Sequence, residues 1–183
     1  MRKKAIFIIC AIIIVICLTS SCSTTRKVSV TEGLRMKLLP TSAIMEPIDA
    51  YQLMDGTIPG YGEAVLDSYL VADSSGIEMY LFAPTGQTIA VVRYDGEKAS
   101  MDSEFIPYGE MAAAYMVFDI QMCYSDAKAI VDSGLEVTES LGEERDRIIS
   151  YKGEILYKIR YVGNTCTLEN IQRAYSYTLE TLE

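Results

Sequence analysis

The sequence of 183 residues predicts an α+β fold in which a curved antiparallel sheet covers two central helices. Short segments in which apolar and polar residues alternate fill both halves of the chain, and turn residues separate them. Between the halves lies a segment without Gly or Pro whose apolar residues recur at spacings of three and four. The turns are too short for the crossovers that parallel strands need, so we expect about 8–10 antiparallel strands.

The first half of the chain predicts a meander of strands. In residues 62–74, every second side chain from Ala64 to Ala72 falls on one face, as in a half-buried strand. Ser74-Ser75-Gly76 then forms a turn that returns the chain. The expected strands are 62–74, 77–83, 87–94 and about 98–106. Two prolines interrupt the preceding segment, in which residues 48–53 fit either a short helix or a strand.

The apolar period changes in the middle of the chain. Residues 110–124 have helical spacing, and a second short helix is expected at 125–132. The side chain of Ser125 or Asp126 would cap the second helix, and Gly134 would end it. The strands expected after it are 135–141, 144–151, 154–162, 167–174 and 175–182.

The strand at 154–162 shows the clearest alternation. Its expected apolar face carries Ile155, Tyr157, Ile159 and Tyr161, and Lys158 and Arg160 lie opposite. One face of the sheet should therefore be dry. The two central helices, with their Met, Tyr and Phe side chains, are the segments available to cover it.

The N-terminus matches an export leader. A basic start precedes an uncharged run from Ala5 to Leu18, which as a helix would be about 21 Å long, short of a hydrocarbon core of ~30 Å. Small residues then lead into Cys22, and together they resemble a bacterial lipobox. We expect residues 1–21 to be a lipoprotein signal peptide and 22–33 an acylated Cys and tether. An ordinary secretory leader or an uncleaved anchor is the alternative.

The lipobox determines the expected location. Acyl chains on Cys22 would anchor the protein to a membrane and leave residues 34–183 as one domain outside it. Ser23 stands where Asp commonly signals retention in the inner membrane. By analogy with lipoprotein sorting, we expect the bacterial outer membrane, with the domain facing the periplasm.

Charge excludes nucleic acid as a partner. The full chain has a net charge of −9, and loss of Arg2, Lys3 and Lys4 with the leader makes it about −12. The remaining chain has no Lys/Arg cluster that would offset repulsion from phosphates. The partners expected are the membrane, a hydrophobic ligand or an envelope protein.

The residue inventory argues against catalysis. The absence of His excludes imidazole bases and His-containing zinc sites. Ser125-Asp126-Ala127-Lys128 has the S-x-x-K spacing of Ser-Lys acyl transferases, but their S-D-N and K-T-G elements are missing. Residues 143–147 alternate in charge and are interpreted as solvated surface. We expect no enzyme activity, no metal and no cofactor.

A diffuse set of residues resembles a known family. The set comprises Tyr94-Asp95-Gly96, residues 116–121, Glu144-Arg145, Tyr161, Leu168, Asn170, Tyr175 and Tyr177. With the leader, it resembles envelope lipoproteins similar in fold to the lipoprotein carriers LolA and LolB; some are encoded with aryl-polyene biosynthesis genes. The resemblance covers about residues 51–182. It implies a half-barrel over helices, with a hydrophobic cavity that in the carriers receives acyl chains.

Tyr and Met are the candidate ligand contacts. The chain has 13 Tyr, 4 Phe and no Trp, and Tyr combines an apolar ring with a polar tip suited to a cavity mouth. The candidate ligand-binding residues are Met111, Tyr115, Phe118, Met122, Tyr157, Ile159, Tyr161, Tyr175 and Tyr177. An ordinary core between sheet and helix is the alternative interpretation.

Two cysteines remain after the leader is removed and Cys22 is acylated. Cys123 and Cys166 would then lie in an oxidising compartment, where they could form a disulfide. The sequence does not show whether their Cα atoms lie close enough to pair. The disulfide is therefore left open.

These observations lead to two hypotheses. The first is a non-enzymatic membrane-anchored lipoprotein that binds or transfers a hydrophobic, acyl-bearing ligand, either a lipid or a lipoprotein. The second is a structural accessory lipoprotein that docks on an envelope protein. A cavity of several hundred Å³ under the central helix would favour the first.

Overall fold

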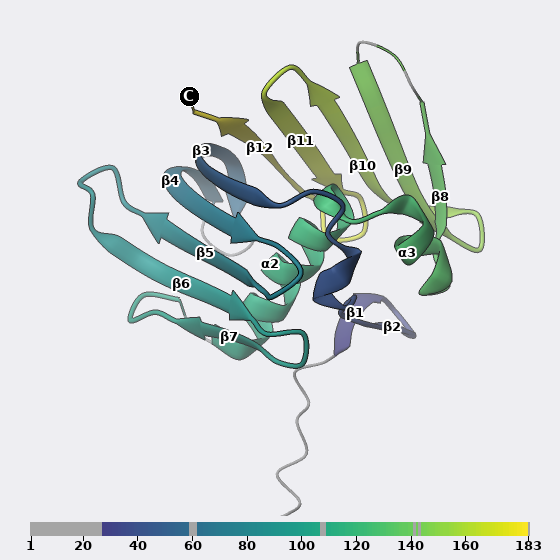
Figure 1. The fold of residues 1–183 in the computed structure, drawn as a ribbon, viewed down its shortest axis with the longest axis horizontal. Coiled ribbons are helices and arrows are strands. Elements are labelled where there is room, and N and C mark those ends of the chain that lie inside the picture. The colour runs from purple at the N-terminus through teal and green to yellow at the C-terminus, as the bar shows by residue number, and fades with distance from the viewer. Residues whose placement is uncertain (1–26, 59–61, 107–108, 141, 143, 183) are drawn as a thin grey trace, which may run out of the picture.

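The computed structural model describes residues 27–58, 62–106, 109–140, 142 and 144–182. The fold is α+β, with a ten-stranded antiparallel sheet, a two-stranded hairpin and two α-helices (Figure 1). The first elements are β1 (Lys27–Thr31), β2 (Leu34–Lys37), the 3-10 turn η2 (Thr41–Ala43), β3 (Ile48–Ile58), β4 (Gly62–Ala72), β5 (Ile77–Phe82), β6 (Thr88–Tyr94) and β7 (Ala99–Asp102). The others are α2 (Gly109–Tyr124), α3 (Ala127–Asp132), β8 (Glu136–Glu139), β9 (Glu144–Tyr151), β10 (Glu154–Val162), β11 (Thr165–Asn170) and β12 (Tyr175–Thr181).

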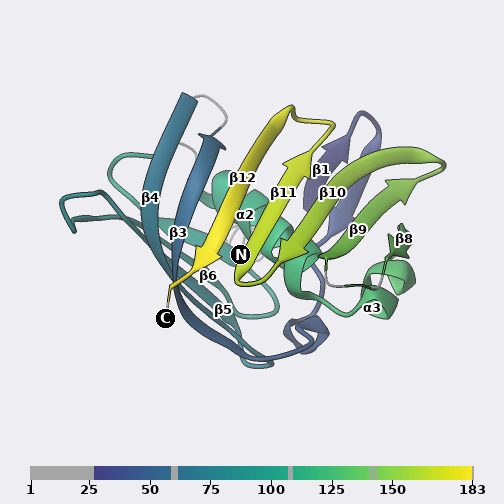
Figure 2. The same cartoon turned by 90° about the horizontal axis from the view of Figure 1, so that it is seen from above.

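The large sheet consists of two meanders joined at its centre. The strand order is β7-β6-β5-β4-β3-β12-β11-β10-β9-β8, so every pair is consecutive in the chain except β3 and β12. These two strands pair antiparallel, with Met54 opposite Leu179, and Figure 2 shows β12 between β3 and β11. The helices connect β7 to β8, which are the two edges of the sheet. The chain between the meanders therefore has to cross the sheet from edge to edge.

One face of the sheet, here called the inner face, packs against α2. Along β4, Ser68, Leu70 and Ala72 are fully buried, whereas Val65 on the opposite face is 50% exposed. In β5, Ile77, Met79 and Leu81 continue the buried row. Each fully buried aliphatic side chain contributes roughly 1.5–3 kcal/mol relative to an exposed one, so this alternation fixes which face is covered.

α2 lies along the inner face, and the sheet bends around it (Figure 1). The helix also contacts β1, so it is covered from a second side. Gln121 ties the chain after β2 to α2: its Oε1 accepts from Leu39 N at 2.9 Å, and its Nε2 donates to Leu39 O at 2.7 Å. Tyr94 Oη donates to the same carbonyl at 2.8 Å. α2 is therefore a core helix rather than a surface helix.

α3 does not share the central position expected for it. It packs beside β8 at one edge of the sheet. Asp126 caps its start by accepting from Lys128 N at 2.6 Å, and Gly134 follows it with φ of 100°. The expected cap and end of this helix are confirmed, but a single helix covers the inner face.

Four segments differ from the sequence prediction. Residues 27–31 form β1 and pair with β2, where a tether was expected. The strand expected at about 98–106 is only β7, and the strand expected at 167–174 is β11, from residue 165 to 170. An irregularity in the β9–β10 register between Ile155 and Tyr157 leaves Ile155 38% exposed. Leu156, rather than Ile155, is buried there, because a bulge changes which side chain faces the core.

The expected signal peptide and Cys22 lie outside the described residues. Within the described part of the chain, no helix has the length and apolar character needed to cross a membrane. The described residues of the domain expected at 34–183 form the ten-stranded sheet, the two helices and β2.

Candidate functional site

A cavity of about 780 Å³ lies between α2 and the inner face of the sheet. This volume is within the ~300–1,000 Å³ range of small-molecule sites. It is lined by Met54, Thr57, Ala64, Leu66, Met79, Leu81, Ile89, Met101, Phe105, Ile106, Met111, Ala112, Tyr115, Met116, Asp119, Ile120, Arg173, Tyr175, Tyr177 and Leu179. Apolar side chains predominate, so the cavity suits a hydrophobic molecule.

One stripe of α2 forms the helical wall. Met111, Tyr115 and Asp119 follow each other at intervals of four, and their neighbours Ala112, Met116 and Ile120 complete the stripe. Residues at this spacing share a helix face. Met111 is 57% exposed, whereas Asp119 and Ile120 are buried, so the stripe runs from the opening of the cavity into the protein.

The first meander and β12 form the opposite wall. Met54, Leu66, Met79 and Leu81 extend from β3, β4 and β5, and Leu179 extends from β12. The lining includes several flexible methionines. Because Met side chains adapt to irregular shapes, this wall can fit chains of different length or branching.

Four of the nine predicted ligand contacts line the cavity. These are Met111 and Tyr115 on α2, and Tyr175 and Tyr177 on β12. The other five lie elsewhere: Phe118, Met122, Tyr157 and Ile159 are at most 2% exposed and belong to the core, and Tyr161 packs against that core. The predicted set is therefore divided between the cavity and the core.

The predicted residues are divided between cavity and core because of the way α2 lies against the inner face of the sheet. A helix is ~10 Å wide, whereas ten strands at ~4.8 Å spacing are several times wider, so one helix leaves two sides to fill. Phe118 faces the second meander, where its ring centroid lies 6.1 Å from that of Tyr157. Side chains fill that side. On the side of β3 to β6, the space remains open as the cavity.

Most residues of the sheet wall and both charged lining residues were not among the ligand contacts predicted from the sequence. The alternation in residues 62–74 placed Leu66 on one face with Ala64 and Ala72, and the next expected strand, 77–83, contains Met79 and Leu81. The pattern gave no sign that they face an open space. Neither Asp119 nor Arg173 could be recognised as a lining residue from the sequence, because the contacts that bring each of them to the cavity are tertiary.

Asp119 is the buried carboxylate of the cavity. It is 4% exposed and accepts hydrogen bonds from Tyr157 Oη at 3.0 Å and from Tyr175 Oη at 2.5 Å. Burial raises the pKa of Asp119 from 3.8 to about 6, against the opposing effects of these hydroxyls and of Arg173. Burial, followed by the nearby charge of Asp119, also raises the pKa of Tyr157 and of Tyr175. Both tyrosines therefore stay neutral and serve as donors.

Arg173 lies beside this carboxylate but does not pair with it. Its guanidinium carbon is 3.5 Å from the centroid of the Tyr115 ring, and Nη2 donates to Ser29 O at 3.0 Å. Its backbone N–H donates to Asn170 Oδ1 at 3.0 Å, and Asn170 in turn donates to Tyr175 Oη at 3.1 Å. These contacts hold the guanidinium against an aromatic ring at the cavity.

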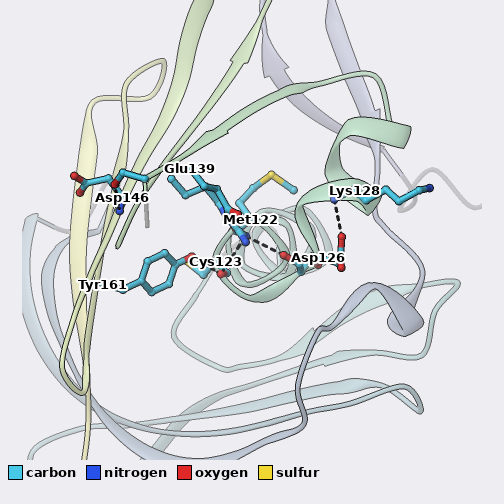
Figure 3. Close-up of polar contacts among 10 residues, drawn as sticks. Met122, Cys123, Asp126, Lys128, Glu139, Asp146 and Tyr161 are labelled. Carbon is cyan, nitrogen blue, oxygen red and sulfur yellow. Dashed lines mark hydrogen bonds and ion pairs between the residues drawn. The ribbon is translucent and has the colours of Figure 1, made fainter. Parts of the chain in front are cut away.

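A second polar cluster surrounds the C-terminal end of α2. Arg147 is 1% exposed; its Nη1 donates to the carbonyls of Met122 at 2.8 Å, Cys123 at 3.3 Å and Ser125 at 2.9 Å. Its Nε donates to Glu139 at 2.7 Å, and Figure 3 shows Glu139, Met122 and Cys123 gathered at this end of the helix. The interpretation of residues 143–147 as solvated surface is wrong for Arg147, because α2 ends beside it and its last carbonyls need donors.

The two cysteines lie together as free thiols. Cys123 and Cys166 are both buried. A hydrogen bond with Cys166 and burial raise the pKa of Cys123 well above its ordinary value. Buried neutral thiols are poor nucleophiles, so this pair packs as part of the core in the structure described.

The S-x-x-K residues do not form a catalytic pair. Ser125 is fully buried, and its Oγ has no hydrogen-bond partner within the described part of the chain. The Lys128 side chain is 81% exposed, and its Nζ donates to Asp132 at 2.6 Å. It points away from the end of α2 (Figure 3). Lys128 therefore does not activate Ser125 in this arrangement.

The comparisons with known proteins give one family. The family model described as Protein of unknown function (DUF3261) matches residues 49–183. No curated protein matches the chain. The matched region includes both helices, nine complete strands of the large sheet, all but the first residue of β3, and every residue that lines the cavity. The match spans most of the chain, and the chain therefore belongs to the DUF3261 family.

Proposed function

We propose that this protein binds a hydrophobic, acyl-bearing ligand in the cavity under α2, without catalysis, as a lipid-anchored protein of the bacterial envelope. The observation that carries the proposal is the apolar cavity of about 780 Å³. Burial of a hydrocarbon chain in such a space is favourable by ~0.8 kcal/mol per CH₂. The proposed anchor is acylated Cys22, at an outer membrane facing the periplasm.

The sheet geometry also supports this proposal. A single sheet that bends around one helix leaves room for a chain-shaped ligand on one side of that helix. We propose that this arrangement is a half-barrel of the LolA/LolB kind, in which the ligand would be a lipid or the acyl chains of a lipoprotein. A catalytic role has less support, because both oxygens of Asp119 already accept hydrogen bonds.

Photolabelling with a fatty acid tests the proposal. The protein is purified from cell envelopes with its natural N-terminus and placed in phosphatidylcholine nanodiscs. A palmitate probe with a diazirine in mid-chain is added and irradiated, and adducts are mapped by mass spectrometry. We expect saturable adducts on peptides that contain Met79, Leu81 or Met116, and loss of these adducts with excess palmitate. Labelling restricted to the membrane-proximal N-terminus would contradict the proposal.

A row of aromatic side chains on the outer face favours a second candidate function, docking on an envelope protein. Tyr51, Tyr69 and Tyr80 lie opposite one another on β3, β4 and β5, with ring centroids 4.6 and 6.2 Å apart. Tyr51 is 59% exposed. Asp49 lies on the same face and accepts from Tyr69 Oη at 2.6 Å. Aromatic residues beside carboxylates suit a partner surface that carries Arg and Lys.

Crosslinking in cells tests the docking candidate. A photoreactive amino acid is placed at Tyr80, which is partly exposed, and a control is placed at Lys158 on the second meander, which is exposed. Docking predicts one discrete protein adduct from position 80 and none from position 158. Equal, diffuse adducts from both positions would argue against a docking surface.

A further inference from the structure

Two charged side chains, Asp119 and Arg173, interrupt the otherwise mostly apolar cavity lining. They differ in depth: Asp119 is 4% exposed, whereas Arg173 is an exposed residue. Arg173 therefore lies towards the opening, and Asp119 lies further inside. A ligand that enters the cavity tail first would leave its polar end near Arg173.

Arg173 is held in place but keeps free donors. Stacking on Tyr115 fixes the plane of the guanidinium, and one hydrogen bond, to Ser29 O, uses one of its five N–H groups. Within the described residues, no carboxylate lies within the 4.0 Å of an ion pair with Arg173. A planar cation without an anionic partner, at the edge of an apolar cavity, is suited to bind a carboxylate or a phosphate.

Asp119 determines the orientation of such a ligand. Tyr157 and Tyr175 donate to its two oxygens, and among the described residues no cation lies within ion-pair distance of them, so Asp119 is a carboxyl group inside the cavity, deeper than Arg173. An anionic head group placed there would be repelled. The only favourable arrangement puts the head group at the opening and the tail against Met79, Leu81 and Met116.

We infer that Arg173 is the binding residue for the anionic head group, carboxylate or phosphate, of an amphiphile whose acyl tail fills the cavity. This inference rests on the proposed function and specifies its ligand. It distinguishes free fatty acids and monoacyl phosphates from neutral lipids such as fatty alcohols. Two hydrogen bonds from one guanidinium to an anion give a selectivity of about tenfold or more.

Competition against the photoactivatable palmitate in nanodiscs tests the inference. The competitors are palmitate, hexadecyl phosphate and 1-hexadecanol, which share a tail of the same length. For the natural protein, we expect at least one anionic competitor to displace the probe about tenfold better than hexadecanol. In Arg173→Met, this advantage should disappear while hexadecanol competes as before. Any difference in partitioning into the nanodisc is the same for both proteins and cancels in the comparison.

Two further variants separate binding from structure. Arg173→Lys keeps the charge and should restore part of the advantage. Arg145→Met removes an equivalent stacked arginine, 4.0 Å from the Tyr161 ring and outside the cavity lining, and should change nothing. The competitor that loses its advantage in Arg173→Met identifies a carboxylate or a phosphate ligand.

An equal effect of all competitors in the natural protein, or an unchanged anionic advantage in Arg173→Met, overturns the inference while leaving the acyl-binding proposal intact. Absence of saturable labelling by the probe overturns both. If Arg173→Met loses displacement by hexadecanol as well, the residue supports the shape of the cavity rather than the head group, and the inference is also wrong.

Discussion

Asp119 lines the candidate site although its burial is costly in energy. It is the only carboxylate of the described cavity lining, and burial raises its pKa from 3.8 to about 6. A difference of about two pH units corresponds to about 3 kcal/mol of stability, lost when the buried carboxyl ionises. The hydroxyls of Tyr157 and Tyr175 offset part of the cost of burial.

Replacing this carboxylate should change how stability depends on pH. The folded-state pKa lies above the unfolded value, so the contribution of Asp119 to the free energy of unfolding is fully present below pH ~4 and is lost as pH rises through ~6. Asp119→Asn should therefore lack a decline of up to about 3 kcal/mol that the natural protein shows between pH 4 and 7. Urea unfolding at several pH values measures this. Parallel pH profiles for the two proteins would show that the carboxyl is not perturbed.

At the scale of one element, α2 depends on Arg147 for its C-terminal end. The carbonyls of Met122, Cys123 and Ser125 are buried with this guanidinium, and no Gly-based cap follows the helix. The strand expected at 144–151 is confirmed as β9, because its pattern is local, and the charged residues 143–147 at its start were interpreted as surface. That local pattern could not show that one of these charges faces a helix end, because that contact joins residues more than 20 positions apart.

Removal of the guanidinium should destabilise the whole fold. Arg147→Met leaves buried carbonyls without a donor and should lower the free energy of unfolding by about 3–5 kcal/mol. Arg160→Met is the matched control, because it breaks an exposed arginine-aspartate pair with Asp146 at 2.9 Å. That change should have little effect. Denaturant unfolding of the two variants measures this difference. Similar decreases in the free energy of unfolding for both would contradict the role assigned to Arg147.

At the scale of the whole molecule, the sequence predicted the elements better than their assembly. Strands β4, β5, β6 and β9 follow the alternation, β10 follows it from Tyr157 onward, and α2 follows its helical spacing. Residues 48–53 were left open between a short helix and a strand, because prolines precede them; they begin the eleven-residue strand β3, whose later part contains Asp55 and Gly56. Its pairing with β12 joins residues more than 120 positions apart, which no local pattern reports.

The residues that line the cavity could likewise be predicted only in part from local patterns. Its helical residues Met111 and Tyr115 could be predicted because helical spacing places them on one stripe. Phe118 fits a helical repeat equally well, yet it packs in the core. α2 contacts β6 and β7 of the first meander as well as β11, and the cavity remains between its Met111 to Asp119 stripe and strands β3 to β5. Which helical side chains face that space depends on the assembled sheet.

If an acyl chain occupies this cavity, a side chain that blocks the cavity should prevent its binding. Ala64 lines the cavity, whereas its neighbour Val65 is 50% exposed on the opposite face of the same strand. Photolabelling of the full chain by the diazirine palmitate should fall severalfold in Ala64→Phe, since the new ring occupies the space of the ligand. It should be unchanged in Val65→Phe. Equal labelling of the two variants, with both folded, would contradict the account.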